Sequence, residues 1–104
     1  MSAQDPNQAW AVSNHLKDYR LNRQATEAHL VLQDGSILHF RKDPFGSFVQ
    51  ASGGQAKRLE PTVLNFEFDR RTLRVNFADG SGLEVAWRGG FLGGRSLDTK
   101  VREA

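Results

Sequence analysis

The sequence predicts an α+β fold that is mainly β: an N-terminal helix followed by an antiparallel meander of about five to six strands, in a small curved sheet or a partly closed barrel. Three observations predict this class. Apolar residues recur at helical spacing up to residue 21, and from residue 27 they alternate with polar residues. Asp-Gly-Ser turns at Asp34 and Asp79 separate the alternating segments, as in antiparallel hairpins.

Length and composition set the limits of the domain. The 104 residues suit one compact domain, residues 1–104, and we expect residues 1–5 and 96–104 to be flexible or loosely docked termini. The absence of cysteine excludes disulfides and thiolate chemistry. No apolar run approaches the ~20 residues of a transmembrane helix, and none is typical of a secretory signal. We therefore expect a cytoplasmic protein that does not insert into a membrane.

The first segment predicts a helix over residues 6–21. Asp5 can accept hydrogen bonds at the helix start, and proline at the first helical position loses no hydrogen bond there. One stripe of the helix would carry the apolar side chains Ala9, Val12, Leu16 and Tyr19. The alternative is a strand that begins near Trp10, because the residues at 13–15, Ser-Asn-His, are poor helix formers.

Two hairpins have a predictable register. A three-residue loop closed by a glycine bulge pairs Leu30 with Leu38 and places the apolar residues of both strands on one face. The same closure at the second turn pairs Val75 with Leu83. A two-residue loop would scatter these residues over both faces, so both hairpins favour the bulged loop.

A third strand extends the second hairpin into a three-stranded unit. The Asp69-Arg70-Arg71-Thr72 turn pairs Phe68 with Leu73. One face is then wholly apolar: Leu64, Phe66, Phe68, Leu73, Val75, Phe77, Leu83, Val85 and Trp87. On the opposite face Arg74 lies between Glu67 and Glu84 as a solvated charge ladder. The apolar face needs a cover, for which the helix and the first hairpin are the candidates.

The middle of the chain links the two hairpins. A turn at residues 43–46 precedes a short strand through Phe48 and Val49, and residues 51–55 are rich in glycine and predict a loop. The two Asp-Gly-Ser turns are similar, but we attribute the likeness to turn chemistry that unrelated hairpins share rather than to a duplicated unit.

No catalytic, cofactor or metal signature is present. The sequence has no nucleophile elbow, phosphate-binding glycine loop or zinc-protease motif, so we expect a domain that is not an enzyme; a small active site between helix and sheet ranks third. The first hairpin sets His29 opposite His39 with Glu27 nearby, which we interpret as a solvated polar face because two histidines alone bind metal weakly. We expect His15 to face solvent on the helix.

The most unusual stretch lies at residues 88–95, where two pairs of glycines bracket Phe91 and Leu92 and arginines bracket the glycines. Such a hinged arm could present both apolar residues to a partner. The other interpretation is a sharp chain reversal that packs Phe91 under the sheet edge. Our first hypothesis is a non-catalytic adaptor that binds another protein through loops or a sheet edge, with Arg88, Phe91, Leu92 and Arg95 as contacts. A sheet edge could also pair with a second copy of the chain.

The alternative hypothesis is a small β-domain that binds nucleic acid. Ten of the fourteen basic residues are arginine, although the net charge is only +2. The candidate contacts are Arg41, Lys42, Lys57, Arg58, Arg70 and Arg71. Against this hypothesis, most aromatic residues alternate onto the apolar face, where they cannot stack on bases. Nucleic-acid affinity would fall steeply with salt, which separates the two hypotheses.

Overall fold

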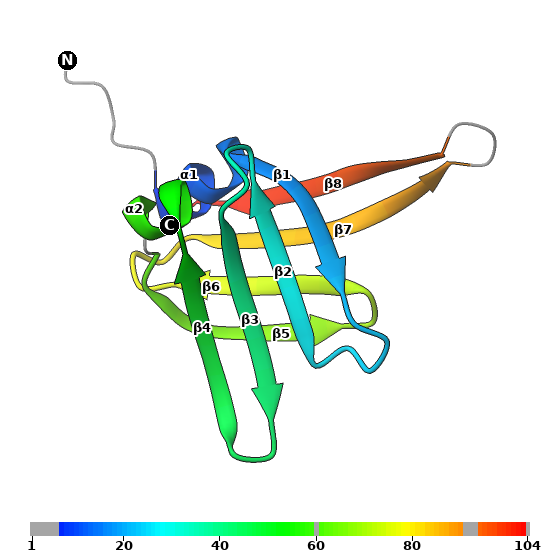
Figure 1. Ribbon diagram of the computed structural model, residues 1–104, viewed down its shortest axis with the longest axis horizontal. Helices are drawn as coiled ribbons and strands as arrows, with labels where there is room; N and C mark the ends of the chain where they lie inside the picture. Colours follow the sequence, from blue (N-terminus) through cyan, green and yellow to red (C-terminus); the bar gives the residue numbers. More distant parts are fainter. Residues whose placement is uncertain (1–6, 60, 91–93, 104) are drawn as a thin grey trace.

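The fold is mainly β, with two helices and two antiparallel sheets of four strands each in the part of the chain that the structure describes (Figure 1). The structure is a computed structural model that describes residues 7–59, 61–90 and 94–103. The N-terminal sheet follows α1 (Gln8–Asn14) and consists of β1 (Leu16–Leu21), β2 (Glu27–Leu32), β3 (Ile37–Asp43) and β4 (Gly46–Ser52). The C-terminal sheet follows α2 (Gly54–Leu59) and consists of β5 (Val63–Asp69), β6 (Thr72–Phe77), β7 (Gly82–Gly90) and β8 (Gly94–Arg102).

The predicted single meander of five to six strands is therefore wrong, although the mainly β class is confirmed. The chain leaves the first sheet after β4, passes through α2 and starts a second meander. The strands of the two sheets cross steeply, so that their apolar faces meet (Figure 1). Phe40 of β3 contacts Phe66 of β5 edge to face, with ring centroids 5.3 Å apart. The physical reason is that each sheet has one apolar face, and each covers the other.

Both hairpins have the predicted register. Leu30 pairs with Leu38, and Val75 pairs with Leu83. In the first loop the amide of Leu32 donates to the carbonyl of Ser36 at 2.8 Å, and Gly35 has a φ of +89°. A positive φ of this size suits glycine and closes the bulged loop.

The N-terminal helix is shorter than predicted, because residues 16–21 form β1. The helix begins after Asn7, whose side chain accepts from the amide of Trp10 at 2.8 Å; the expected cap, Asp5, lies outside the described residues. The apolar spacing misled the prediction because β1 contains a bulge between Leu16 and Asp18. One extra residue in a strand turns side chains three apart, in this case Leu16 and Tyr19, toward the same face, as in a helix.

A second bulge corrects the predicted apolar face of the C-terminal sheet. The register of β5 shifts between Val63 and Asn65, so that Leu64 is 66% exposed rather than buried. Val63 packs against the core instead. The other members of the predicted face are buried or half-buried.

The charge ladder has the predicted register but a different set of partners. Arg74 lies opposite both Glu67 and Glu84, and its Nε is 3.5 Å from Glu84 Oε1. The carboxylate of Glu67 instead binds the ammonium of Lys42 from the N-terminal sheet. Glu67 binds Lys42 because the two sheets pack against each other. The alternation of residues along the strands does not predict this contact.

Two segments for which no strand or helix was predicted form regular secondary structure. Residues 51–55, predicted as a loop, form the end of β4 and the start of α2, and residues 96–102 lie in β8. His15 was expected to face solvent, but it forms the C-cap of α1 and its Nδ1 lies 3.1 Å from Nε2 of Gln55 in α2.

The two halves of the chain repeat one arrangement, a helix followed by a four-stranded meander. The repeat reaches beyond the two turns to which we attributed the sequence likeness. The bulges of β1 and β5 lie at equivalent positions, and so do two backbone hydrogen bonds of 2.8 Å, from Gln33 to His15 and from Ala78 to Thr62. Because the helices, the bulged strands and the acceptor residues His15 and Thr62 all lie outside the two turns, turn chemistry alone does not explain the likeness.

Each helix is held by the turn of the opposite half. The carboxylate of Asp79 accepts from the amide of Gln8 in α1 at 2.8 Å, and that of Asp34 accepts from the amide of Gln55 in α2 at 2.7 Å. The hydroxyls of the turn serines, Ser81 and Ser36, accept from the next helix amide in each case. The first amides of a helix have no acceptors within the helix, and the two turns provide those acceptors.

These hydrogen bonds predict a stability that depends on acid pH. The Ser36 hydroxyl and amide and the Gln55 amide hold the pKa of Asp34 at about 2, and the Ser81 hydroxyl lowers the pKa of Asp79. Because both values lie below those of the unfolded chain, the stabilisation is complete above about pH 5 and is lost as the pH falls toward about 2. Thermal midpoints measured across this range should fall for the wild type. The double variant Asp34→Asn/Asp79→Asn should have a lower midpoint at neutral pH and a shallower fall.

A pair of substitutions tests the bulge in β5. Phe66→Ala removes a side chain that is 5% exposed and should cost about 3–5 kcal/mol of unfolding free energy. Leu64→Ala should cost no more than about 0.5 kcal/mol, because this side chain faces solvent. Urea denaturation measures both, and similar losses for the two variants would contradict the shifted register of β5.

Candidate functional site

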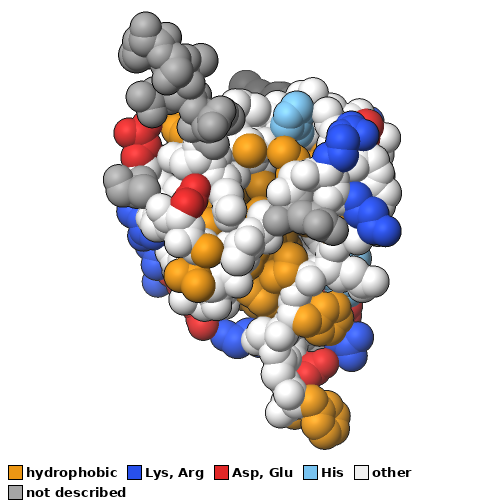
Figure 2. All heavy atoms as spheres, turned by 90° about the vertical axis from the view of Figure 1, so that its left-hand side faces the viewer, with side chains coloured by type: hydrophobic (Ala, Val, Ile, Leu, Met, Phe, Trp, Pro, Cys, Tyr) orange, Lys and Arg blue, Asp and Glu red, His pale blue; other side chains and the backbone are white. Residues whose placement is uncertain are grey.

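A groove of about 480 Å³ lies between β4 of one sheet and β5 of the other. Its apolar lining comes from both sheets: Phe48 and Val49 on one bank, and Pro61, Val63, Leu64 and Phe66 on the other. Figure 2 shows apolar side chains gathered on this side of the molecule. The groove exists because the two sheets cross and leave their edge strands apart at this corner.

Large exposed apolar side chains concentrate around this groove. Phe48 is 39% exposed and Leu64 is 66% exposed, one on each bank. Phe45, in the turn that leads into β4, is 98% exposed. Trp10 on α1 is the fourth such residue in the part of the chain that the structure describes. An apolar cluster of this kind on a domain surface is typical of an interaction site.

The edge strand β4 has none of the features that normally protect a sheet edge. It pairs with β3 without a register shift from Ile37↔Ser52 to Asp43↔Gly46, and its seven residues include no charge and no proline. The other three edge strands are protected: β1 and β5 carry a bulge and charged residues, and β8 carries charges of both signs. Natural sheets block their edges with such features because an open edge pairs with other chains.

A row of rings supports the outer bank of the groove. The imidazoles of His29 and His39 stack with centroids 4.4 Å apart, and His39 meets the ring of Phe48 edge to face at 5.7 Å. The guanidinium of Arg41 lies 5.5 Å from the centroid of the same Phe48 ring. Burial lowers the pKa of His29, and the adjacent His39 lowers it further. These contacts fix Phe48 in position at the groove.

An ion pair lies in the lining of the groove. Lys42 Nζ donates to both carboxylate oxygens of Glu67, at 2.8 and 2.9 Å. Both side chains are substantially exposed, so the ion pair contributes little to stability. The groove therefore offers an apolar surface with a charged pair beside it.

The structure does not test the contacts predicted at residues 88–95. Phe91 and Leu92 lie outside the described residues. Arg88 is in β7, where its Nη2 lies 3.5 Å from Asp98 Oδ2, and Arg95 pairs with Gly89 in the β7–β8 ladder. The site that the fold does present, around β4, was not singled out from the sequence. The uncharged run at residues 46–52 was the available signal, but it gains meaning only when β4 is known to be an edge.

The six basic residues of the nucleic-acid hypothesis lie in three separate places. Lys57 and Arg58 are in the last turn of α2, whereas Arg70 and Arg71 form the β5–β6 turn at the other end of that sheet (Figure 1). Arg41 and Lys42 are adjacent in β3 and bind Asp43 and Glu67. The fold does not combine these residues into one basic surface.

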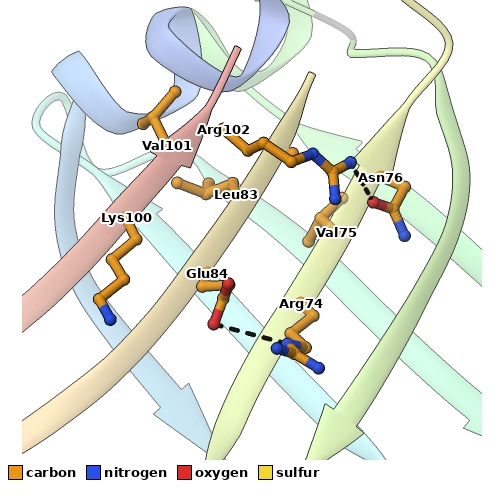
Figure 3. Close-up of a pocket in the computed structure, with 9 residues that line it drawn as sticks. Arg74, Val75, Asn76, Leu83, Glu84, Lys100, Val101 and Arg102 are labelled. Carbon is orange, nitrogen blue, oxygen red and sulfur yellow. Dashed lines mark hydrogen bonds and ion pairs between the residues drawn. The ribbon is translucent and has the colours of Figure 1, made fainter. Parts of the chain in front are cut away.

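A second hollow, also of about 480 Å³, lies on the outer face of the C-terminal sheet over Gly82 (Figure 3). Arg102 reaches across Gly82 and donates to Asn76 Oδ1 at 2.7 Å. A Cβ at Gly82 would lie 2.8 Å from Nη2 of that guanidinium, so the Arg102 side chain would have to shift to accommodate it. Arg74 and Glu84 pair beside it, so this hollow contains a polar network of mutually bound side chains.

The described residues contain no group of three His, Cys, Asp or Glu side chains able to hold a metal ion. His39 Nε2 lies 2.9 Å from Glu27 Oε1, and His29 stacks on His39. Burial raises the pKa of Tyr19 to about 12, so its phenol stays protonated at neutral pH. Within the same described part of the chain, neither helix is long and apolar enough to cross a membrane.

No protein-family model, no curated protein and no solved structure matches this chain.

Proposed function

We propose that this domain binds another protein by pairing an extended segment of that protein with β4. The observation that carries the proposal is the edge itself. Within the described sheets, β4 alone lacks charge, proline and bulge, and it borders an apolar groove with exposed side chains on both banks. In this mode of recognition the main chain supplies hydrogen bonds, and pockets for alternate side chains supply specificity.

The geometry of the groove favours an extended segment over a folded surface. An added strand would lie beside β4, and every second side chain would point inward between the sheets. These inward side chains would meet Val49 on one bank and Pro61, Val63 and Phe66 on the other. An alternating apolar segment of a partner satisfies this arrangement.

A second copy of the chain fits less well than a different protein. If two β4 strands paired with each other, the inward side chains of the incoming strand would be Ser47, Val49 and Ala51. These side chains are too small to fill the groove, and cavities left in an interface cost stability. A partner with larger apolar side chains fills the same space.

Charge also favours a protein partner over nucleic acid. The outer face beside Phe48 carries Arg20 and Arg41, but each of them is bound to a carboxylate, Asp18 and Asp43 respectively. Glu27 adds a further negative charge to that face. A phosphate backbone requires unpaired cations along its path, and this face does not provide them.

Selection from a random peptide library on the immobilised full chain tests the proposal. We expect the selected peptides, labelled for fluorescence anisotropy, to bind the chain in solution. Amide hydrogen exchange should show new protection in β4 upon binding, because its outer N–H groups gain partners. Failure to select any peptide, or protection that appears elsewhere and not in β4, would refute the proposal.

Two matched substitutions provide the control. Ser47→Lys introduces a charge on β4 and should weaken binding of the selected peptides by at least about 10-fold, since an edge charge opposes strand addition. Ser96→Lys makes the same change at an exposed serine of the edge strand β8 and should alter binding by less than about 2-fold. Thermal midpoints should be unchanged in both variants. Equal effects of the two lysines on binding would argue against β4 as the docking strand.

A further inference from the structure

The internal repeat gives the β4–β5 groove a counterpart between β8 and β1. When the two hairpins are aligned on their Asp-Gly-Ser turns, Lys42 of β3 and Trp87 of β7 occupy equivalent positions. Each lies ten residues after the last residue of the preceding strand, which is Leu32 in β2 and Phe77 in β6. Tyr19 of β1 and Phe66 of β5 are likewise equivalent, because each follows the same bulge by one residue. The two corners of the fold can therefore be compared position by position.

The counterpart corner is filled from within the chain. The indole of Trp87 extends from β7 to β1, where Nε1 donates to the carbonyl oxygen of Tyr19 at 2.6 Å. Leu97 and Val101 of β8 pack against the core beside it. The space left there, lined by Trp87, Tyr19 and two further residues, is only about 120 Å³.

The β4–β5 corner lacks each of these large apolar side chains. Lys42 stands where the other half has Trp87, and Lys42 points away to Glu67. Ser47 of β4 is the equivalent of Leu97 of β8, because Ser47 pairs with Lys42 and Leu97 pairs with Trp87. Ala51 of β4 is likewise the equivalent of Val101, because these two residues pair with Leu38 and Leu83. Each β4 residue is therefore smaller than its β8 equivalent. The same backbone frame thus leaves about 480 Å³ open at this corner.

We infer that the partner segment inserts a tryptophan side chain into the β4–β5 groove, in the position that Trp87 occupies in the counterpart corner. This inference rests on the proposed function and specifies its ligand. The indole would lie between Val49 and Phe66, and its N–H would donate to the carbonyl of Phe66, the equivalent of Tyr19.

A peptide series tests the inference. Among peptides selected on the full chain that protect β4, we expect a tryptophan to be enriched. Replacing that tryptophan by phenylalanine should weaken binding by about 3- to 10-fold, because only the hydrogen bond is lost. Replacing it by alanine should weaken binding by about 100-fold or more. Selected peptides that protect β4 but carry no essential tryptophan would overturn the inference and leave the proposed function standing.

A substitution in the chain itself gives a second test. Lys42→Trp introduces a tryptophan at the position equivalent to Trp87. The new side chain should fill the groove from within the chain itself. We expect the variant to lose peptide binding by at least about 20-fold, to keep or raise its thermal midpoint, and to show blue-shifted emission from the introduced indole. Lys42→Ala removes the same ion pair without filling the groove and should change binding by less than about 3-fold.

The outcomes separate the two proposals. If Lys42→Trp is folded and binds the peptides as well as the wild type, the tryptophan does not occupy this position and the inference is wrong. If Ser47→Lys also leaves binding intact, the groove is not the docking site and the proposed function fails as well.

Discussion

The reciprocal attachment of helices to turns is the interaction on which the rest of the structure depends. Each Asp-Gly-Ser turn closes its own hairpin and also holds the first amides of the helix from the other half. Neither helix is long enough to be stable alone, so each depends on the acceptors that the turn of the opposite half provides for its first amides. The same bonds keep the apolar faces of the two sheets together, which neither four-stranded meander could bury by itself.

This shared frame makes the differences between the halves informative. Both halves keep the same hairpin register and the same bulge, and these features build the core. They differ at one corner, where Trp87 closes the C-terminal half and Lys42 leaves the N-terminal half open. Because the fold tolerates an indole at this position, the open groove is not a steric requirement of the architecture. A site thus arises where one half departs from the pattern of the other.

The two halves also carry different side chains at equivalent positions on the outer faces of their sheets. Where the C-terminal sheet pairs Arg74 with Glu84, the N-terminal sheet stacks His29 on His39 and extends the row of rings to Phe48. Either pair satisfies a solvated face. Only the ring cluster, however, supports an apolar side chain at the edge of the sheet, next to the strand that lacks protection.

The sequence by itself determined the local features of this protein. Alternation with period two and the length of the glycine-closed loops fix which residues face each other in both hairpins, because these rules act between neighbours in the chain. Tertiary structure decided the rest. The bulge in β1 turns Leu16 and Tyr19, three residues apart, toward the same face, and the sequence pattern does not distinguish such a strand from a helix. The bulge in β5 turns Leu64 outward. The division into two sheets, the partner of Glu67 and the groove depend on which strands end as edges and where two faces cross. Those are contacts between distant segments, and no local pattern encodes them.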